Sequence, residues 1–283
     1  MPNAFVPERP VVVAYQKMPE AFAEVDLIGK FLKEKGYDAP QGSINDEGLR
    51  KRVKNGDFDM LIAVGGDGTM LRAGHLCAPY GVPILGIKLG RIGFLIQVES
   101  NEWREMLERL FKGEAWIENR TMLSAEHVRA DETLARWQAL NEVVVGRGMI
   151  LRPVRLEAHV DGRLLTTFVC DGLIAATATG STAYALAAGG PILPPDLRNI
   201  LLVPIAAHLS MDRAVVLAEG SSVSFIVKSD NTVISVDGQP SSPLEEDDHV
   251  DVRVSDFAVK FVRFGDPGYF YRNLNAHMNQ PHL

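Results

Sequence analysis

The first hundred residues alternate between short, wholly apolar runs and amphipathic stretches. The apolar runs predict strands of a parallel sheet covered on both faces, at 11–15, 60–64 and 82–87. Apolar residues recur at helical spacing from Phe22 to Leu32 and over 103–111, and the stretch from Thr69 is expected to stay helical until Pro79. The alternation predicts an α/β domain with an open, mostly parallel, Rossmann-like sheet, which binds ligands beyond the carboxyl ends of its strands.

From about residue 119 the apolar positions change to a period of two, which is typical of strands with one buried face. Hairpins are expected over 154–170, around Asp161-Gly162, and over 223–236, around Asp230-Asn231. Residues 250–264 are expected to form a further pair of strands.

These patterns predict two domains. The α/β domain, which carries the GGDGT turn, is expected over residues 1–118, and a β-rich, sandwich-like domain over 119–265. The tail, 266–283, is expected to rejoin the first domain through a short terminal helix at 269–278.

The composition of this 283-residue chain excludes several classes of binding partner. A net charge of −7 leaves no general basic face for nucleic acid or for an anionic membrane surface. Cys77 and Cys170 lack the spacing of a zinc site, and we expect both to be small buried apolar residues. Since no stretch approaches the ~20 apolar residues of a membrane span, we expect a cytoplasmic protein that acts on small molecules.

A glycine-rich turn, GGDGT, directly follows the apolar strand at 60–64 and precedes a helix. Backbone amides at such a turn bind phosphate, and glycines remove the side chains that would block it. The central Asp67 is either a simple helix N-cap or a functional carboxylate, which takes a proton from an attacking hydroxyl or engages Mg²⁺. The phosphate loop is expected to comprise Gly65, Gly66, Gly68, Thr69 and Arg72.

A second turn, TATGSTAY (177–184), also follows a predicted strand. It gathers threonine and serine hydroxyls around Gly180, where small residues let a flat ligand approach the backbone and hydroxyls supply hydrogen bonds. Gly180 and Ser181 are expected to join the phosphate loop. Close packing of a helix on a sheet explains the alanines that follow, 185–188, equally well.

Taken together, these stretches resemble the NAD kinase family, whose members phosphorylate the 2′-hydroxyl on the adenosine ribose of NAD to give NADP. The matching motifs occur in the family's order over most of the chain: GGDGT (65–69), LGRIGFL (89–95), NE (141–142), DGLIAATATGSTAYALAAGGP (171–191), His208 to Arg213, and DGQ (237–239). GGDGT alone is shared with diacylglycerol and sphingosine kinases, whereas the block at 171–191 is much more specific.

The resemblance implies a role for each matching residue. Asp67 would be the base that takes the proton from the ribose hydroxyl, with Mg²⁺ accompanying ATP. The dinucleotide would be bound by Gly68, Phe94, Asn141, Glu142, Asp171, Thr182, Ala183, Tyr184, His208 and Gln239. Family members are generally homo-oligomers, so a homodimer or homotetramer is expected.

Three positions depart from the family's usual motifs. Ala178 and Ala214 replace prolines, which loosens the local backbone. Lys88 replaces a neutral asparagine with a cation, so the choice among ATP, another nucleotide and polyphosphate as phosphoryl donor stays open.

Two other classes of protein fit parts of the pattern. A lipid kinase would share GGDGT but needs an apolar acceptor pocket or a membrane-facing patch. A non-catalytic dinucleotide sensor would keep the binding turns, but it gains nothing from a carboxylate beside phosphates.

Overall fold

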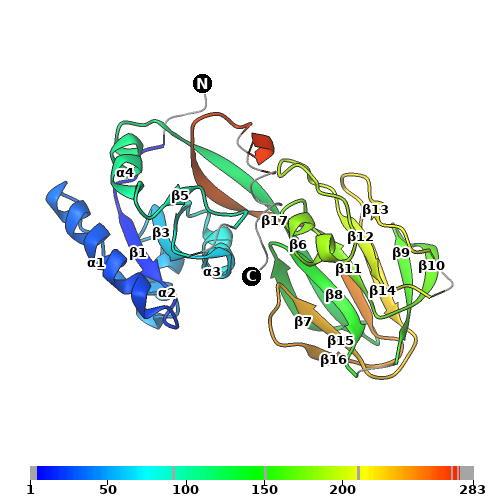
Figure 1. Ribbon diagram of the computed structural model, residues 1–283. Helices are drawn as coiled ribbons and strands as arrows, with labels where there is room; N and C mark the ends of the chain where they lie inside the picture. The colour runs from blue at the N-terminus through cyan, green and yellow to red at the C-terminus, as the bar shows by residue number, and fades with distance from the viewer. Residues whose placement is uncertain are drawn as a thin grey trace. The chain divides into compact units, whose positions relative to one another are not determined.

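The computed structural model describes residues 5–90, 93–149, 152–208, 211–268, 270–272 and 274. The chain divides into two compact units, the first made of Met1–Asn119 and Ala258–Leu283, the second of Arg120–Phe257. Two long strands, β6 (Ala115–Arg129) and β17 (His249–Phe264), contribute residues to both units (Figure 1). No helix within the described residues is long and apolar enough to cross a membrane.

The first unit contains the predicted parallel sheet. Its strands follow the order β2 (Gln41–Ser43), β1 (Pro10–Ala14), β3 (Met60–Gly65) and β4 (Ile84–Lys88). The short strand β5 (Val98–Glu99) and the second half of β17 both pair with β4. All of these pairings are parallel, as expected for an open Rossmann-like sheet.

Helices cover both faces of this sheet (Figure 1). The apolar stripes of α1 (Pro19–Glu34) and α4 (Trp103–Phe111) form a common core with one face. On the other face lies α3 (Asp67–Cys77), whose Met70 packs directly over Gly86. The remaining helical segments are α2 (Glu47–Lys54), beside α3, and the short η1 (Ala78–Tyr80).

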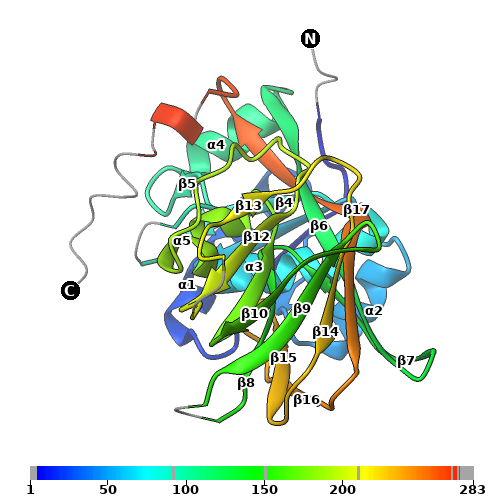
Figure 2. The ribbon, with the colours of Figure 1, turned by 90° about the vertical axis from the view of Figure 1, so that its right-hand side faces the viewer.

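The second unit contains two facing layers of strands. One layer has β10 (Arg163–Cys170), β9 (Val154–Val160), β14 (Val223–Val227) and the first half of β17 side by side, with β6 and β7 (Glu132–Ala139) beyond (Figure 2). The other layer has the order β13 (Val215–Val216), β12 (Leu201–Ile205), β11 (Gly172–Ala176), β8 (Glu142–Arg147), β15 (Thr232–Val236) and β16 (Ser242–Leu244). The inward side chains of both layers, among them Phe168 and Phe225, form one shared buried core.

The predicted hairpin over 154–170 is confirmed. β9 and β10 pair antiparallel, and the turn residues Asp161 and Gly162 have positive φ angles of 49° and 76°.

Two predictions for the C-terminal strands were wrong. β14 pairs with β9 and β17, whereas β15 pairs with β8 and β16, so the turn at Asn231 carries the chain between layers instead of closing a hairpin. β17 is one continuous strand, although 250–264 was expected to form two. Period-two alternation identifies the buried face of a strand, but it does not identify the strand's partner.

Residues 270–272 and 274 are helical, in the region of the predicted terminal helix. The rest of that prediction, over 269–278, lies outside the described residues.

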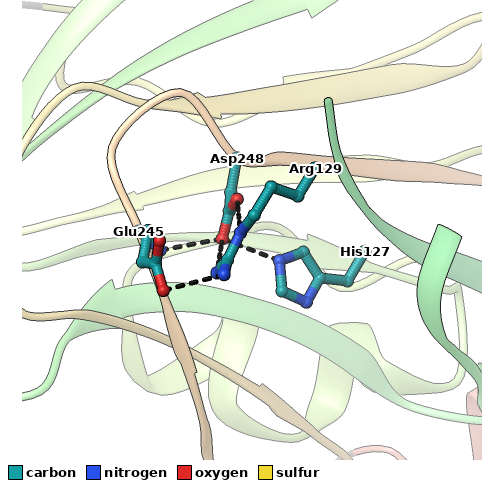
Figure 3. Close-up of polar contacts among 4 residues, drawn as sticks. All are labelled: His127, Arg129, Glu245 and Asp248. Atoms are coloured by element: carbon teal, nitrogen blue, oxygen red, sulfur yellow. Dashed lines mark hydrogen bonds and ion pairs between the residues drawn. The ribbon is translucent and has the colours of Figure 1, made fainter. Parts of the chain in front are cut away.

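A cluster of charged residues around the buried Asp248 links β6 to the turn before β17 (Figure 3). The fully buried carboxylate of Asp248 accepts hydrogen bonds from Arg129 (2.7 and 2.9 Å) and from the Glu245 backbone amide (2.8 Å). His127 Nε2 lies 2.7 Å from the same carboxylate, and Arg129 also donates to Glu245 (2.7 Å). The cluster satisfies a charge that would otherwise be costly to bury.

Candidate functional site

The glycine-rich turn lies where β3 ends and α3 begins. The N-cap residue of α3 is Gly66, and Asp67 is the first residue of the helix. The simple N-cap interpretation of Asp67 is therefore excluded. The Asp67 carboxylate instead accepts hydrogen bonds from the backbone amides of Phe94 (2.9 Å) and Leu95 (3.3 Å).

Gly93 permits this close approach. A Cβ atom at position 93 would lie 2.2 to 2.3 Å from the Asp67 carboxyl atoms, which is far inside van der Waals contact. Gly93 has no local sequence signal for this role, because its partner is 26 residues earlier in the chain and only the fold brings them together.

Hydrogen bonds to β17 fix the segment 94–97, whose first two backbone amides bind Asp67. The buried Arg263 donates to the Leu95 carbonyl (2.9 Å) and pairs with Glu118 (2.7 Å). Gln97 exchanges two hydrogen bonds with the Phe264 backbone, at 2.9 and 3.0 Å. The carboxylate of Asp67 is thus held by a loop that is fixed at several points.

The glycines of the turn have different reasons to be glycine. A Cβ at Gly65 would lie 2.4 Å from Thr69 Oγ1, so Gly65 is required by internal packing. A Cβ at Gly66 would meet nothing within 4 Å, and one at Gly68 only an Arg72 nitrogen at 3.7 Å. Neither Gly66 nor Gly68 has a positive φ. Their bare backbone therefore serves no need within the described fold, and it suits an approaching phosphate.

Two cations lie near this turn. Arg72 is exposed, donates to the Gly68 carbonyl (2.9 Å) and stacks over Tyr15, with 4.1 Å to the ring centroid. Lys88 is buried at the end of β4, as the register partner of Gly65, and forms an ion pair with Glu99 of β5. The charge that distinguishes Lys88 from an asparagine is therefore countered within the same sheet.

In the second unit, the TGSTAY turn packs on the strand that begins at Glu142. A Cβ at Gly180 would lie 2.1 Å from the Asn141 carbonyl oxygen, so the two backbones are in direct contact. Thr177 donates to the Leu140 carbonyl (2.6 Å) and accepts from the Gly180 amide (3.0 Å).

The structure places the Ser181 hydroxyl inside the fold. It donates to the Ala178 carbonyl (2.6 Å) and accepts from the Leu193 amide (2.9 Å), and the residue is fully buried. This hydroxyl holds the turn together. The alanine-rich run that follows is helical only over the short α5 (Tyr184–Ala187), and Ala185 is core.

Asn141 and Glu142 are not simply exposed residues at the end of a strand. Asp237 accepts the backbone amides of both residues, at 2.8 and 2.9 Å. Glu142 is only 7% exposed, and its Oε2 has no hydrogen-bond partner among the described residues. Burial, and next the charge of Asp237, raise the pKa of Glu142 to about 7, against a hydrogen bond from the Tyr184 amide.

A cavity of about 230 Å³ lies on the outward face of the same sheet. Its lining includes Asp171 and Tyr184 of the predicted set, together with Val144, Gly146, Arg147, Ile205, Val233 and Ser235. Arg147 and Asp171 form an ion pair across 2.9 Å. Thr182 and Ala183 lead into α5, whereas His208 and Gln239 are exposed and do not line this cavity.

Metal-binding and thiol chemistry are limited in the described part of the chain. No three His, Cys, Asp or Glu side chains there gather as metal ligands. Cys77 and Cys170 are free and buried, as predicted, and burial raises the pKa of the Cys170 thiol to about 12.

A strand, a glycine turn with bare amides and a fixed carboxylate in that turn form an arrangement suited to phosphoryl transfer, which places the chain among the kinases. Two family models agree and refine the class. Residues 21–115 match the ATP-NAD kinase N-terminal domain, and residues 140–264 match the ATP-NAD kinase C-terminal domain. The chain belongs to the NAD kinase family, and its reaction is the phosphorylation of NAD to NADP.

Individual relatives cover most of the chain. The NAD kinase of Chloroflexus aurantiacus is 37% identical over 95% of this chain and 98% of its own length. That of Heliobacterium modesticaldum is 41% identical over 82% of each chain. A solved NAD kinase from Archaeoglobus fulgidus, in complex with ATP, has a TM-score of 0.74 at 27% identity and covers 95% of this chain and 98% of its own. A yeast NADH kinase solved with NADH shares the fold, with a TM-score of 0.83 at 22% identity over 98% of this chain and 89% of its own.

Proposed function

We propose that Asp67 is the general base that takes the proton from the adenosine-ribose 2′-hydroxyl of NAD as the γ-phosphoryl group of ATP is transferred to it. The observation that carries this role is the fixed Asp67 carboxylate, held by the amides of Phe94 and Leu95 beside the open backbone of Gly66 and Gly68. A positioned base of this kind contributes about 10²–10⁴-fold in rate. In-line transfer needs little else beyond positioning and charge stabilisation.

We propose that the phosphates of ATP lie on the amides of the turn, with Gly65, Thr69 and Arg72 shaping it and Gly180 and Ser181 holding the second turn. Mg²⁺ would enter with ATP and neutralise charge on its phosphates. The Asp67 carboxylate is an oxygen ligand of the type that Mg²⁺ prefers. The Lys88 to Glu99 pair beside Gly65 is compatible with ATP as donor, and a polyphosphate donor is the alternative to test.

We propose that NAD is bound through the second-unit residues around the cavity and the Asn141-Glu142 strand start. Asp171 and Tyr184 line that cavity, and Glu142 offers a buried carboxyl oxygen. The other residues proposed to contact the dinucleotide are Gly68, Phe94, Thr182, Ala183, His208 and Gln239. On the resemblance to the family, we further propose a homodimer or homotetramer in the cytoplasm.

The test is NADP formation by the purified protein from NAD, ATP and Mg²⁺, compared with Asp67→Asn. We expect the variant to lose about two orders of magnitude or more in kcat while it still binds NAD, because an amide cannot accept the proton. Asp59→Asn is the matched control, since Asp59 also accepts two backbone amides, those of Glu8 and Arg9 (both 2.9 Å). Equal activity of Asp67→Asn and the parent protein would reject Asp67 as the base.

A further inference from the structure

Asp237 forms several hydrogen bonds with the backbone of residues 140–142. It lies directly after β15 with a positive φ of 48°, and its carboxylate accepts the amides of three consecutive residues: Leu140 (2.7 Å), Asn141 (2.8 Å) and Glu142 (2.9 Å). Its own amide donates back to the Glu142 carbonyl (3.0 Å). Asp237 therefore fixes the backbone from which Asn141 and Glu142 project. From the sequence, only Gln239 of the DGQ motif was expected in the site, and Asp237 had no expected role.

The charge of Asp237 also acts on the side chain of Glu142. One carboxyl group is buried near another, so the charge of Asp237 makes ionisation of Glu142 less favourable. The Tyr184 amide from α5 acts in the opposite direction. Of the cations in the same unit, Arg147 pairs with Asp171 (2.9 Å), and Arg120 donates to Thr179 Oγ1 (3.2 Å). Asp237 is thus the one charged side chain among the described residues whose field is found to act on Glu142.

The unpartnered Oε2 of Glu142 points to a ligand. A buried carboxyl oxygen without a hydrogen-bond partner is costly, and the cost disappears when a bound hydroxyl donates to it. A ribose hydroxyl binds more strongly to the ionised carboxylate than to the neutral acid, because the hydrogen bond is then charge-assisted.

We propose that Asp237 is a positioning residue for dinucleotide binding: it holds in place the Asn141-Glu142 backbone, and with it the Glu142 carboxyl group that accepts a ribose hydroxyl. The negative charge of Asp237 also opposes the ionisation of Glu142. This inference rests on the proposed role of Glu142 in binding NAD. It makes the affinity for NAD dependent on pH near neutrality, weaker on the acid side.

The test is the dissociation constant for NAD, measured by calorimetry between pH 5 and pH 8.5 without ATP, so that ionisation of ATP plays no part. In the parent protein, affinity should fall as the pH decreases through about 7. Glu142→Gln should lose this dependence. Asp237→Asn removes the charge but keeps one acceptor oxygen, and the midpoint should move to lower pH by about one unit.

Asp161→Asn is the matched control. Asp161 is another aspartate with positive φ (49°) that accepts a backbone amide, that of Ser222 (2.9 Å), in the turn between β9 and β10. Its loss should leave the midpoint unchanged even if the protein is less stable. An unchanged midpoint in Asp237→Asn, or a surviving pH dependence in Glu142→Gln, would overturn the inference. NAD binding without NADP formation by the parent protein would instead reject the proposed function, and the binding data would still decide the role of Asp237.

Discussion

Gly93 and Gly68 lie near the same carboxylate, and their missing side chains serve opposite purposes. At Gly93 the space for a Cβ is filled by the Asp67 carboxylate, at 2.2 to 2.3 Å. At Gly68 a Cβ would have room, with its nearest contact, to Arg72, at 3.7 Å. Gly93 is therefore required by the packing around Asp67, whereas the packing around Gly68 imposes no such requirement.

This difference predicts separable effects of two alanine substitutions. Gly93→Ala should displace the Asp67 carboxylate and lower kcat by about 10²-fold, since a shift of about 1 Å in a catalytic group has that effect. Gly68→Ala should leave kcat largely intact but raise the KM for ATP by about tenfold, and it should not lower the unfolding temperature, because alanine is the better helix residue. Steady-state kinetics and thermal unfolding of both variants check this. Equal kcat in Gly93→Ala and the parent protein would contradict the proposed position of the base.

At the residue scale, the sequence predicted the site where its chemistry is local. Asp67 and the glycines beside it are contiguous, and strand-turn-helix order alone indicates a phosphate turn. The roles of Gly93 and Asp237 could not be predicted from the sequence. Each residue contacts residues that are far away along the chain, and no local motif marks such a contact. The hydrogen bonds of Asp237 span 95 to 97 residues.

At the scale of elements, the apolar pattern predicted strands better than it predicted their neighbours. The Asp161-Gly162 and Asp230-Asn231 turns look alike in sequence, yet the first closes a hairpin and the second moves the chain to the facing layer. Residues 250–264 were expected to form two strands, but β17 continues through Ser255 and Asp256 and changes partner from β14 to β4. Pairing is decided by the packing of whole layers, which a local window does not contain.

The Asp248 cluster joins two elements and predicts a dependence of stability on pH. Burial alone would raise the pKa of Asp248, but hydrogen bonds from Arg129, the Glu245 amide and His127 outweigh burial and hold that pKa well below its usual value. A carboxyl group with a lowered folded-state pKa stabilises the fold above its unfolded pKa of about 3.9, and this contribution is lost as the pH falls further. The free energy of unfolding should therefore decrease below about pH 4.

Asp248→Asn tests this contribution directly. It should lower the free energy of unfolding at pH 7 by about 1–3 kcal/mol, because it removes the charge of the buried acceptor to which Arg129, His127 and the Glu245 amide donate, and it should weaken the acid dependence. Urea unfolding at pH 7, 4 and 3 provides the measurement. Asp247→Asn, one residue away and 72% exposed in its pair with Lys228, should change stability by less than about 0.5 kcal/mol. Identical behaviour of the two variants would show that the cluster does not stabilise the fold.

At the scale of the whole molecule, the first unit is discontinuous in sequence. Val262 and Phe264 belong to its core, and Phe261 pairs with Ile84 of β4. A chain that ends at residue 257 lacks this strand and should leave the amides of β1 and β3 unprotected in hydrogen exchange, while β11 and β12 stay protected. A chain that ends at residue 268 keeps the strand and should retain protection in both units. Full protection of β1 in the shorter chain would refute the requirement.

The route of β17 also has a consequence for how the protein is made. The parallel sheet of the first unit is completed by residues that leave the ribosome after the whole of the second unit, residues 120–257. At about 5–20 residues per second, synthesis of the second unit takes roughly 7 to 30 s. During that time the part of β4 around Ile84, which pairs with β17 and not with β5, lacks its partner on one edge, and such an edge can pair with other nascent chains. The order of synthesis, and not only the final fold, therefore determines how long the N-terminal sheet stays incomplete.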